Sequence, residues 1–152
     1  EAQRLLQGKE RLLAYVVGEE RSRVFIVRPA GEEAAFRDLE SEVVASLCQR
    51  QQVVLALGGG AVLREANQKM LARCRPVVWL QASAPVLAAR LAGDPTTAQR
   101  RPNLTNRGGL HEIEQMLALR EPIYRSVATL VVDTEGKDPV EIAEEILAAL
   151  AH

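Results

Sequence analysis

Three arginines and a run of three glycines have the types and spacing that could do chemistry. Arg37 stands in the segment FRDLE, Arg101 in RRPNL and Arg120 in LALREPIY. The glycines follow an apolar run in VVLALGGGAV and are Gly58, Gly59 and Gly60. Arginine presents a rigid fork of N–H donors that matches a carboxylate or a phosphate, and glycine lets a ligand approach backbone N–H groups closely. Together these residues predict a site for a small anion.

Each of these residues also has a purely structural interpretation. Arg37 can simply pair with Glu33 or Glu40 along its own helix, which stabilises a helix by a few tenths of a kcal/mol. Arg120 directly precedes a Glu-Pro pair and can end its helix, where cations are favoured. The glycines can form a turn that lets the next helix begin. The sequence leaves both interpretations open at each position.

Strand-like and helix-like segments alternate around these residues. Two β-rich runs, residues 12–17 and 24–27, flank a polar loop and predict a hairpin. From residue 53 onward the alternation predicts an α/β fold with a parallel sheet flanked by helices. The glycines end an apolar strand typical of the interior of parallel sheets, whose ligands gather at the carboxyl ends of the strands. The expected helices cover 31–50, 64–74, 83–93, 110–128 and 138–150, and the expected strands cover 53–57, 76–82 and 129–134.

Helical spacing and capping residues refine three of these helices. In the first helix, Leu39 and Val43 belong to a predicted buried stripe that also includes Phe36 and Leu47, and Glu40 is expected at the surface. Ser83 is the expected N-cap of the helix over 83–93, with Pro85 in its first turn. Asp138, Pro139 and Glu141 predict a capping box at the start of the last helix.

The segment over residues 93–109 differs in character from its surroundings. It is polar, is broken by Pro and Gly, and carries Arg100, Arg101 and Arg107. Long polar loops in compact domains are commonly lids or binding loops. We therefore expect a lid here.

Composition describes an ordinary soluble globular protein. The 152 residues are 47% hydrophobic and 26% charged, with a formal net charge of -1, so no bulk attraction to nucleic acid or to a membrane is expected. No apolar run approaches a membrane span, and the first residues are unlike a signal peptide. Cys48 and Cys74 lack the ligand spacing of a zinc site, so no metal site is expected. These features predict a cytoplasmic protein with reduced, structural thiols.

The order of six segments resembles the shikimate kinase family over about residues 31–150. The segments are GEEAAFRDLE, VVLALGGGAV, VVWLQA, RRPNL, LALREPIY and VVDT. The resemblance implies a P-loop-kinase-like, nucleoside-monophosphate-kinase-like fold. It also implies a transferase that moves the γ-phosphate of ATP, with Mg²⁺, to a hydroxyl of shikimate in aromatic amino acid biosynthesis.

The same resemblance implies roles for individual residues. Arg37 and Arg120 would bind the shikimate carboxylate, and Gly58, Gly59 and Gly60 would lie against its ring and hydroxyls. Arg101 would close with the lid onto the phosphates, although Asn103 in the same segment stands where many members have Leu. Lys137, after the last strand, would border the adenine.

The chain departs from the family in the part that binds phosphate. Family members begin with a P-loop, G-x-x-x-x-G-K-[ST], and a D-x-D segment, and neither pattern occurs in these residues. The segment QRLLQGKE has Gln3 in place of the first glycine and Glu10 in place of the hydroxyl. The segment VVDTEGKD fails in the same way, and Asp133, which ends its strand, is expected to be structural.

Residues 5–29 resemble instead the opening hairpin of a CHAT-type, caspase-like domain. We expect one domain over 1–152, with a hairpin segment over 1–30 in place of the first strand and P-loop and a shikimate-kinase-like part over 31–152. Such a chain would be chimaeric, with its seam near residues 28–33. The hairpin would fill the sheet within the chain, with one antiparallel strand, or two chains would pair through unpaired strand edges as a homodimer.

These features predict a shikimate-kinase-family protein whose phosphotransferase activity is impaired or lost, because phosphoryl transfer depends on the P-loop lysine and Mg²⁺. Shikimate or a similar carboxylate would still bind. One alternative is a working kinase whose phosphate site is rebuilt from the glycines and the lid. Another alternative is a non-enzymatic module that senses a metabolite or binds another protein.

Overall fold

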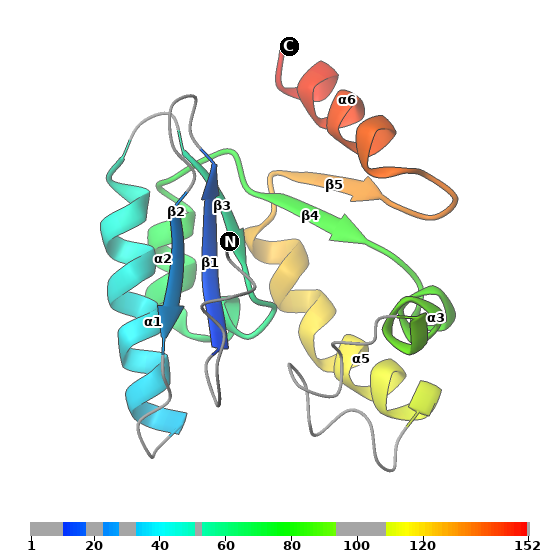
Figure 1. Ribbon diagram of the computed structural model, residues 1–152, viewed down its shortest axis with the longest axis horizontal. Helices are drawn as coiled ribbons and strands as arrows, with labels where there is room; N and C mark the ends of the chain where they lie inside the picture. Colours follow the sequence, from blue (N-terminus) through cyan, green and yellow to red (C-terminus); the bar gives the residue numbers. More distant parts are fainter. Residues whose placement is uncertain (1–10, 18–22, 28–32, 51–52, 94–108, 152) are drawn as a thin grey trace. The chain divides into compact units, whose positions relative to one another are not determined.

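The computed structural model describes residues 11–17, 23–27, 33–50, 53–93 and 109–151 (Figure 1). The chain divides into two compact units, residues 1–74 and 75–152, and each unit is described by itself. Helices and strands occur in both, so the protein is of the α/β class, as the sequence predicts. No helix among the described residues is long and apolar enough to cross a membrane.

The first unit contains a three-stranded sheet in the order β2-β1-β3. Strands β1 (Arg11–Val17) and β2 (Arg23–Val27) pair antiparallel, which confirms the predicted hairpin. Strand β1 also pairs antiparallel with β3 (Val54–Leu57), from Ala14 opposite Leu57 to Val17 opposite Val54. The prediction that a hairpin strand joins this sheet within the chain and runs antiparallel is therefore confirmed for this edge of β3.

The environment of β3 differs from the expected interior parallel strand. Its described neighbour, β1, runs antiparallel to it, because β2 and β3, which α1 connects, run in the same direction and β1 lies between them antiparallel to both. The side chain of Val54 is 67% exposed. An apolar run alone does not reveal which neighbour a strand will have or how far it will be covered.

Helix α1 (Glu33–Cys48), the short 3₁₀ helix η2 (Ala61–Leu63) and α2 (Glu65–Leu71) complete the first unit. Val44 and Leu47 of α1 are buried, and Leu47 packs against Val53 and Leu55. The predicted stripe is only partly right, because Leu39 is 40% exposed whereas Glu40 is 4% exposed. The helix is thus rotated so that a carboxylate faces inward.

The second unit is built on a parallel pair of strands, β4 (Val78–Gln81) and β5 (Leu130–Asp133). Their register places Trp79 opposite Val131 and Leu80 opposite Val132. This pair confirms the predicted parallel pairing. Its helices are α3 (Ala84–Gly93), α5 (Gly109–Val127) and α6 (Pro139–Leu150).

Helices lie on both faces of this strand pair. The ring of Trp79 on β4 contacts Tyr124 of α5, with their centroids 5.8 Å apart. Leu80 points to the opposite face, because successive strand residues alternate, and it lines a cavity together with Ile142 of α6. The second unit is therefore layered as helix, strand pair and helix.

The capping residues act largely as predicted. Asp138 accepts hydrogen bonds from the backbone N–H groups of Val140 and Glu141, and the side chain of Glu141 accepts from the N–H of Asp138. This is the predicted capping box. Ser83 directly precedes α3, its carbonyl accepts the first helical bond from Leu87, and its backbone N–H donates to Glu135.

Candidate functional site

The guanidinium of Arg37 lies against the backbone of Gly60. A Cβ placed on Gly60 would lie 2.7 Å from Nη1 and 2.9 Å from Nη2 of Arg37. Gly60 has φ -83° and ψ -20°, a conformation that any residue adopts. Glycine at this position therefore leaves room for the guanidinium, which would have to shift for any larger residue, and two predicted site elements meet.

Glu40 fixes the position of the Arg37 side chain. Nη1 of Arg37 donates to Oε2 of Glu40 at 2.8 Å, and the side chains are 26% and 5% exposed respectively. A buried carboxylate is costly unless it is paired. The structural interpretation of Arg37 as a partner of Glu40 is thus correct, and the same contact aims its guanidinium at the glycine turn.

The three glycines form the turn that leaves β3. The carbonyl of Gly58 accepts from the N–H of Ala61 at 2.9 Å, and the carbonyl of Gly60 accepts from Leu63 at 3.2 Å. Gly58 and Gly59 are exposed, and a Cβ on Gly58 would meet nothing within 4 Å. The turn is therefore exposed at Gly58 and Gly59, next to the glycine that the Arg37 guanidinium contacts.

A second arginine near this turn was missed by sequence reasoning. Arg64, at the start of α2, donates to Oδ1 of Asp38 at 2.6 Å and contacts Oγ of Ser41 at 3.5 Å. Asp38 is 68% exposed, so this pair contributes at most about 1 kcal/mol. Its effect is to fasten the start of α2 to α1, and no local sequence pattern marks a pairing between two helices.

Arg120 lies inside α5, in the second unit. The helix continues through Pro122 to Val127, so the interpretation that Arg120 ends its helix is wrong. Beyond the proline, the last turns of α5 contact Trp79 of β4. The ring of Tyr124 lies against the Trp79 ring, and the guanidinium of Arg125 lies 5.4 Å from the Trp79 ring centre. Arg120 is half-buried, and in the described part of the chain its side chain makes no hydrogen bond or ion pair.

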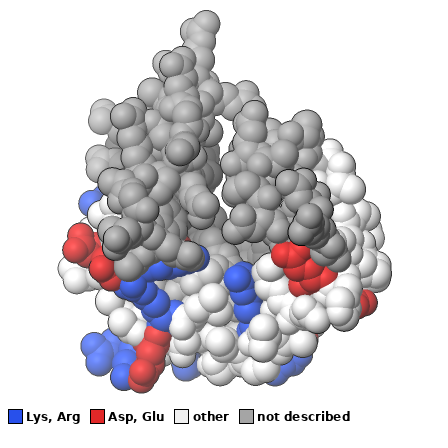
Figure 2. Space-filling model, turned by 90° about the horizontal axis from the view of Figure 1, so that it is seen from below, with Lys and Arg blue, Asp and Glu red and all other residues white. Residues whose placement is uncertain are grey.

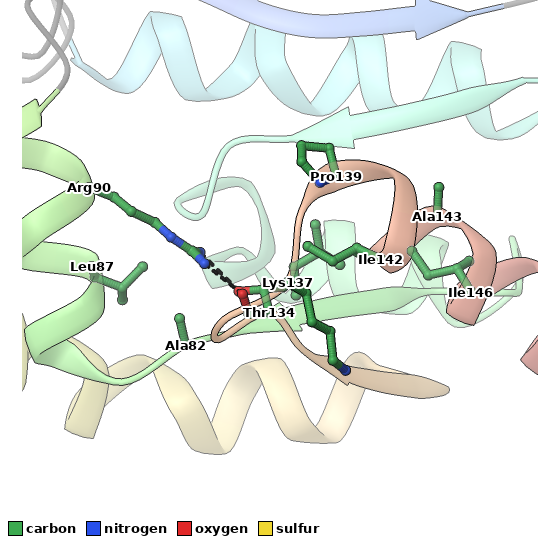
Figure 3. A pocket seen from close by; sticks show the side chains of 10 residues that line it. Ala82, Leu87, Arg90, Thr134, Lys137, Pro139, Ile142, Ala143 and Ile146 are labelled. Carbon is green, nitrogen blue, oxygen red and sulfur yellow. Dashed lines mark hydrogen bonds between the residues drawn. The ribbon is translucent and has the colours of Figure 1, made fainter.

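Lys137 borders an open cavity of about 560 Å³ in the second unit (Figure 3). Its Nζ forms an ion pair with Glu145. Arg90, which the sequence analysis did not identify, reaches the same cavity and donates to Oγ1 and the carbonyl oxygen of Thr134 at 2.9 and 2.7 Å. Apart from Arg90, Thr134 and Lys137, the residues that line the cavity are apolar. They are Leu80, Ala82, Leu87, Pro139, Ile142, Ala143 and Ile146.

The carboxylate of Asp133, at the end of β5, forms a hydrogen bond with nearby backbone. Its Oδ1 accepts a hydrogen bond from the N–H of Glu135 at 3.0 Å, which agrees with a structural role. The described residues contain no group of three or more His, Cys, Asp or Glu side chains that could hold a metal ion. Arg101, its lid segment, Gln3 and Glu10 lie outside the described residues.

The two cysteines are free and half-buried. The thiol of Cys74 donates to the carbonyl of Cys48 at 3.4 Å, which links the ends of α1 and α2. Burial, with the neighbouring Cys74, raises the pKa of Cys48 to about 12. This environment agrees with the predicted structural thiols.

Charged side chains of both signs occur side by side on the described part of the face shown in Figure 2. Within the first unit, Arg64 forms an ion pair with Asp38 and Lys69 forms one with Glu65. This mixture fits a formal net charge of -1.

Comparison with known proteins places this geometry in a family. A family model for shikimate kinase matches residues 12–151. A shikimate kinase from Rhodopirellula baltica is 46% identical over 117 residues, which are 77% of this chain and 63% of that protein. One from Pseudomonas fluorescens is 40% identical over 120 residues, which are 79% of this chain and 67% of that protein.

A solved structure of a shikimate kinase from Acinetobacter baumannii in complex with shikimate is similar to this chain. The TM-score is 0.70 at 29% identity, and the match covers 78% of this chain and 64% of that one. The chain thus spans somewhat under two thirds of the Rhodopirellula and Acinetobacter proteins. The family match begins at residue 12, so the family likeness extends beyond the expected 31–150 and the CHAT-type resemblance receives no support. The chain belongs to the shikimate kinase family, with its P-loop-kinase fold.

Proposed function

We propose that this chain binds shikimate through Arg37, the Gly58–Gly60 turn and Arg120. The contact between the Arg37 guanidinium and Gly60 carries the proposal. It places a fork of N–H donors beside the exposed glycine turn, which suits a carboxylate next to ring hydroxyls. That the related Acinetobacter structure is a complex with shikimate supports the choice of ligand.

Arg37 would bind the carboxylate and the glycine turn would contact the ring. Glu40 holds Nη1 of Arg37 and so reduces the conformational entropy lost when a carboxylate binds. Arg120, in the second unit, is the further shikimate-binding residue that the family resemblance implies.

Members of the family use ATP and Mg²⁺, and the cavity beside Lys137 fits the nucleoside part of ATP. Apolar walls suit a purine ring, and Lys137 and Arg90 place positive charge at the same cavity. We propose that these two residues hold the nucleotide and that Arg101 approaches its phosphates from the lid. Bound ATP would supply the γ-phosphoryl group.

The 152-residue chain on its own would transfer phosphate far more slowly than a kinase with a P-loop. Its sequence contains no G-x-x-x-x-G-K-[ST] segment, whose backbone N–H groups and lysine neutralise the phosphates. Kinases typically turn over at about 1–100 per second. A coupled assay of ADP release with this chain should show no turnover in that range, and turnover within it would refute the loss of activity.

Thermal unfolding with and without shikimate tests the binding proposal. Shikimate at about 100 times its Kd adds roughly 2.7 kcal/mol to the folded state, which raises the Tm by about 5–10 °C. Arg37→Ala should abolish this increase, and Arg37→Lys, which keeps a charge beside Glu40 but loses the fork, should reduce it. Arg50→Ala removes an exposed arginine of the same unit and should leave the increase intact. An equal increase in wild type and Arg37→Ala would refute the proposal.

A further inference from the structure

The polypeptide changes direction between the glycine turn and α2. Arg64 has extended backbone angles, φ -83° and ψ 127°, so the hydrogen bonds of η2 do not continue as a helix into α2. Because the helical hydrogen bonds stop at Arg64, this single extended residue is the only backbone link between η2 and α2. The position of the turn must be fixed by other contacts.

Two consecutive side chains of α2 bridge this break. Nδ2 of Asn67 donates to the carbonyl of Ala61 at 2.8 Å, and Nε2 of Gln68 donates to the carbonyl of Val62 at 2.9 Å. Both donors come from the first turns of α2, and both acceptors belong to η2. The two amides therefore fasten the end of the glycine turn to α2.

The environment of Asn67 indicates that the role of this side chain is to donate the hydrogen bond from Nδ2. Asn67 is 0% exposed, and its Oδ1 has no hydrogen-bond partner in the described part of the structure. A buried acceptor without a partner costs free energy that an apolar side chain of similar size would avoid. Packing alone therefore does not favour an amide at this position, whereas holding the Ala61 carbonyl does.

The bond from Asn67 acts close to the candidate site. Ala61 is 1% exposed and directly follows Gly60, against which the Arg37 guanidinium lies. A shift of the Ala61 carbonyl would move Gly60 relative to Arg37. We infer that Asn67, supported by Gln68, is a positioning residue that holds the glycine turn at the Arg37 guanidinium for shikimate binding. This inference rests on the proposed function.

Asn67→Leu tests the inference, because it keeps the number and branching of the side-chain heavy atoms and removes both the donor and the unpaired acceptor. Hydrogen exchange of the Ala61 and Leu63 amides, which donate to Gly58 and Gly60, should become about tenfold faster, as expected when one hydrogen bond is lost. The Kd for shikimate should rise about tenfold, which corresponds to about 1.4 kcal/mol, while the Tm of the free protein stays close to that of wild type.

Two further variants make the test independent of folding problems. Gln68→Met removes the second donor from a partly exposed position and should change exchange and Kd in the same direction by a smaller factor. Lys69→Met breaks only an exposed ion pair with Glu65, at 71% exposure of the lysine, and should change neither.

The outcomes separate this inference from the proposed function. Normal shikimate binding by wild type together with an unchanged Kd in Asn67→Leu and Gln68→Met overturns the positioning role alone. Unchanged exchange of Ala61 and Leu63 overturns it as well. Absence of shikimate binding by wild type overturns the proposed function and, with it, this inference.

Discussion

The guanidinium of Arg37 occupies the space that a Cβ of residue 60 would need, because that atom would lie 2.7 Å from Nη1. Gly60→Ala should therefore displace the Arg37 side chain, although the backbone angles of Gly60 suit alanine. We expect a stable fold whose shikimate Kd is raised about tenfold or more. Calorimetric titration measures this change.

Gly93→Ala is the matched control for that substitution. Gly93 ends α3, and a Cβ there would meet nothing within 4 Å. This variant should leave the shikimate Kd unchanged. Equal Kd values for Gly60→Ala and wild type would show that the Arg37 contact is irrelevant to binding.

The Arg37–Glu40 pair should be energetically coupled. Removal of Arg37 leaves the buried carboxylate of Glu40 without the cation 2.8 Å away, and removal of Glu40 frees the guanidinium to move. Urea unfolding of the single and double alanine variants should give a coupling free energy of about 1–2 kcal/mol. Additive effects of the two substitutions would contradict a functional pair.

Glu135 should make the stability depend on acid pH. Hydrogen bonds from the side chain and backbone of Ser83 hold the pKa of Glu135 below its usual 4.5. Because the folded pKa is the lower one, this contact stabilises the fold above the usual pKa and is lost as the pH falls through the folded pKa. Tm measurements from pH 6 down to pH 3 should show a smaller fall for Glu135→Gln than for wild type. Parallel curves would count against the contact.

Cys48 should react slowly with alkylating reagents. With its pKa raised to about 12, it has very little of the reactive thiolate at pH 8, so alkylation should be roughly a hundredfold or more slower than for an exposed cysteine. Mass spectrometry of the Cys48 peptide after iodoacetamide treatment gives its rate in the folded wild-type protein and after unfolding in urea. Equal rates in folded and unfolded protein would contradict the raised pKa.

Lys137→Ala should weaken nucleotide binding at the cavity of the second unit. The substitution removes a cation from the cavity wall, so the Kd for a fluorescent ADP analogue should rise about threefold to tenfold. Arg125→Ala removes a cation outside this lining and is the control. If both variants bind the analogue as wild type does, the nucleotide lies elsewhere.

Much of the fold was predictable because its signals are local. The hairpin of β1 and β2 followed from two β-rich runs around a polar loop, and the capping box followed from Asp138, Pro139 and Glu141. The parallel pairing of β4 with β5 followed from the alternation of strands and helices.

The remaining features depend on contacts between distant residues. Helical periodicity placed Glu40 at the surface, because an unpaired carboxylate is costly to bury. The ion pair with Arg37 lowers that cost, and the periodicity of the sequence does not reveal this pairing. The expected helix over 110–128 is confirmed, and only the alternative that Arg120 ends it is wrong; the contact of Tyr124 with Trp79 lies beyond Pro122 and could not be read from the sequence. Likewise, no short sequence motif predicts the hydrogen bonds from Arg90 to Thr134 and from Asn67 to Ala61.

Calorimetric titration of the 152-residue chain with shikimate in the absence of nucleotide is the decisive test of shikimate binding through Arg37. We expect saturable binding of one shikimate per chain, with a Kd that Arg37→Lys raises about tenfold or more and Arg50→Ala leaves unchanged. No binding by the folded wild-type chain, or the same Kd in wild type and Arg37→Lys, would contradict it.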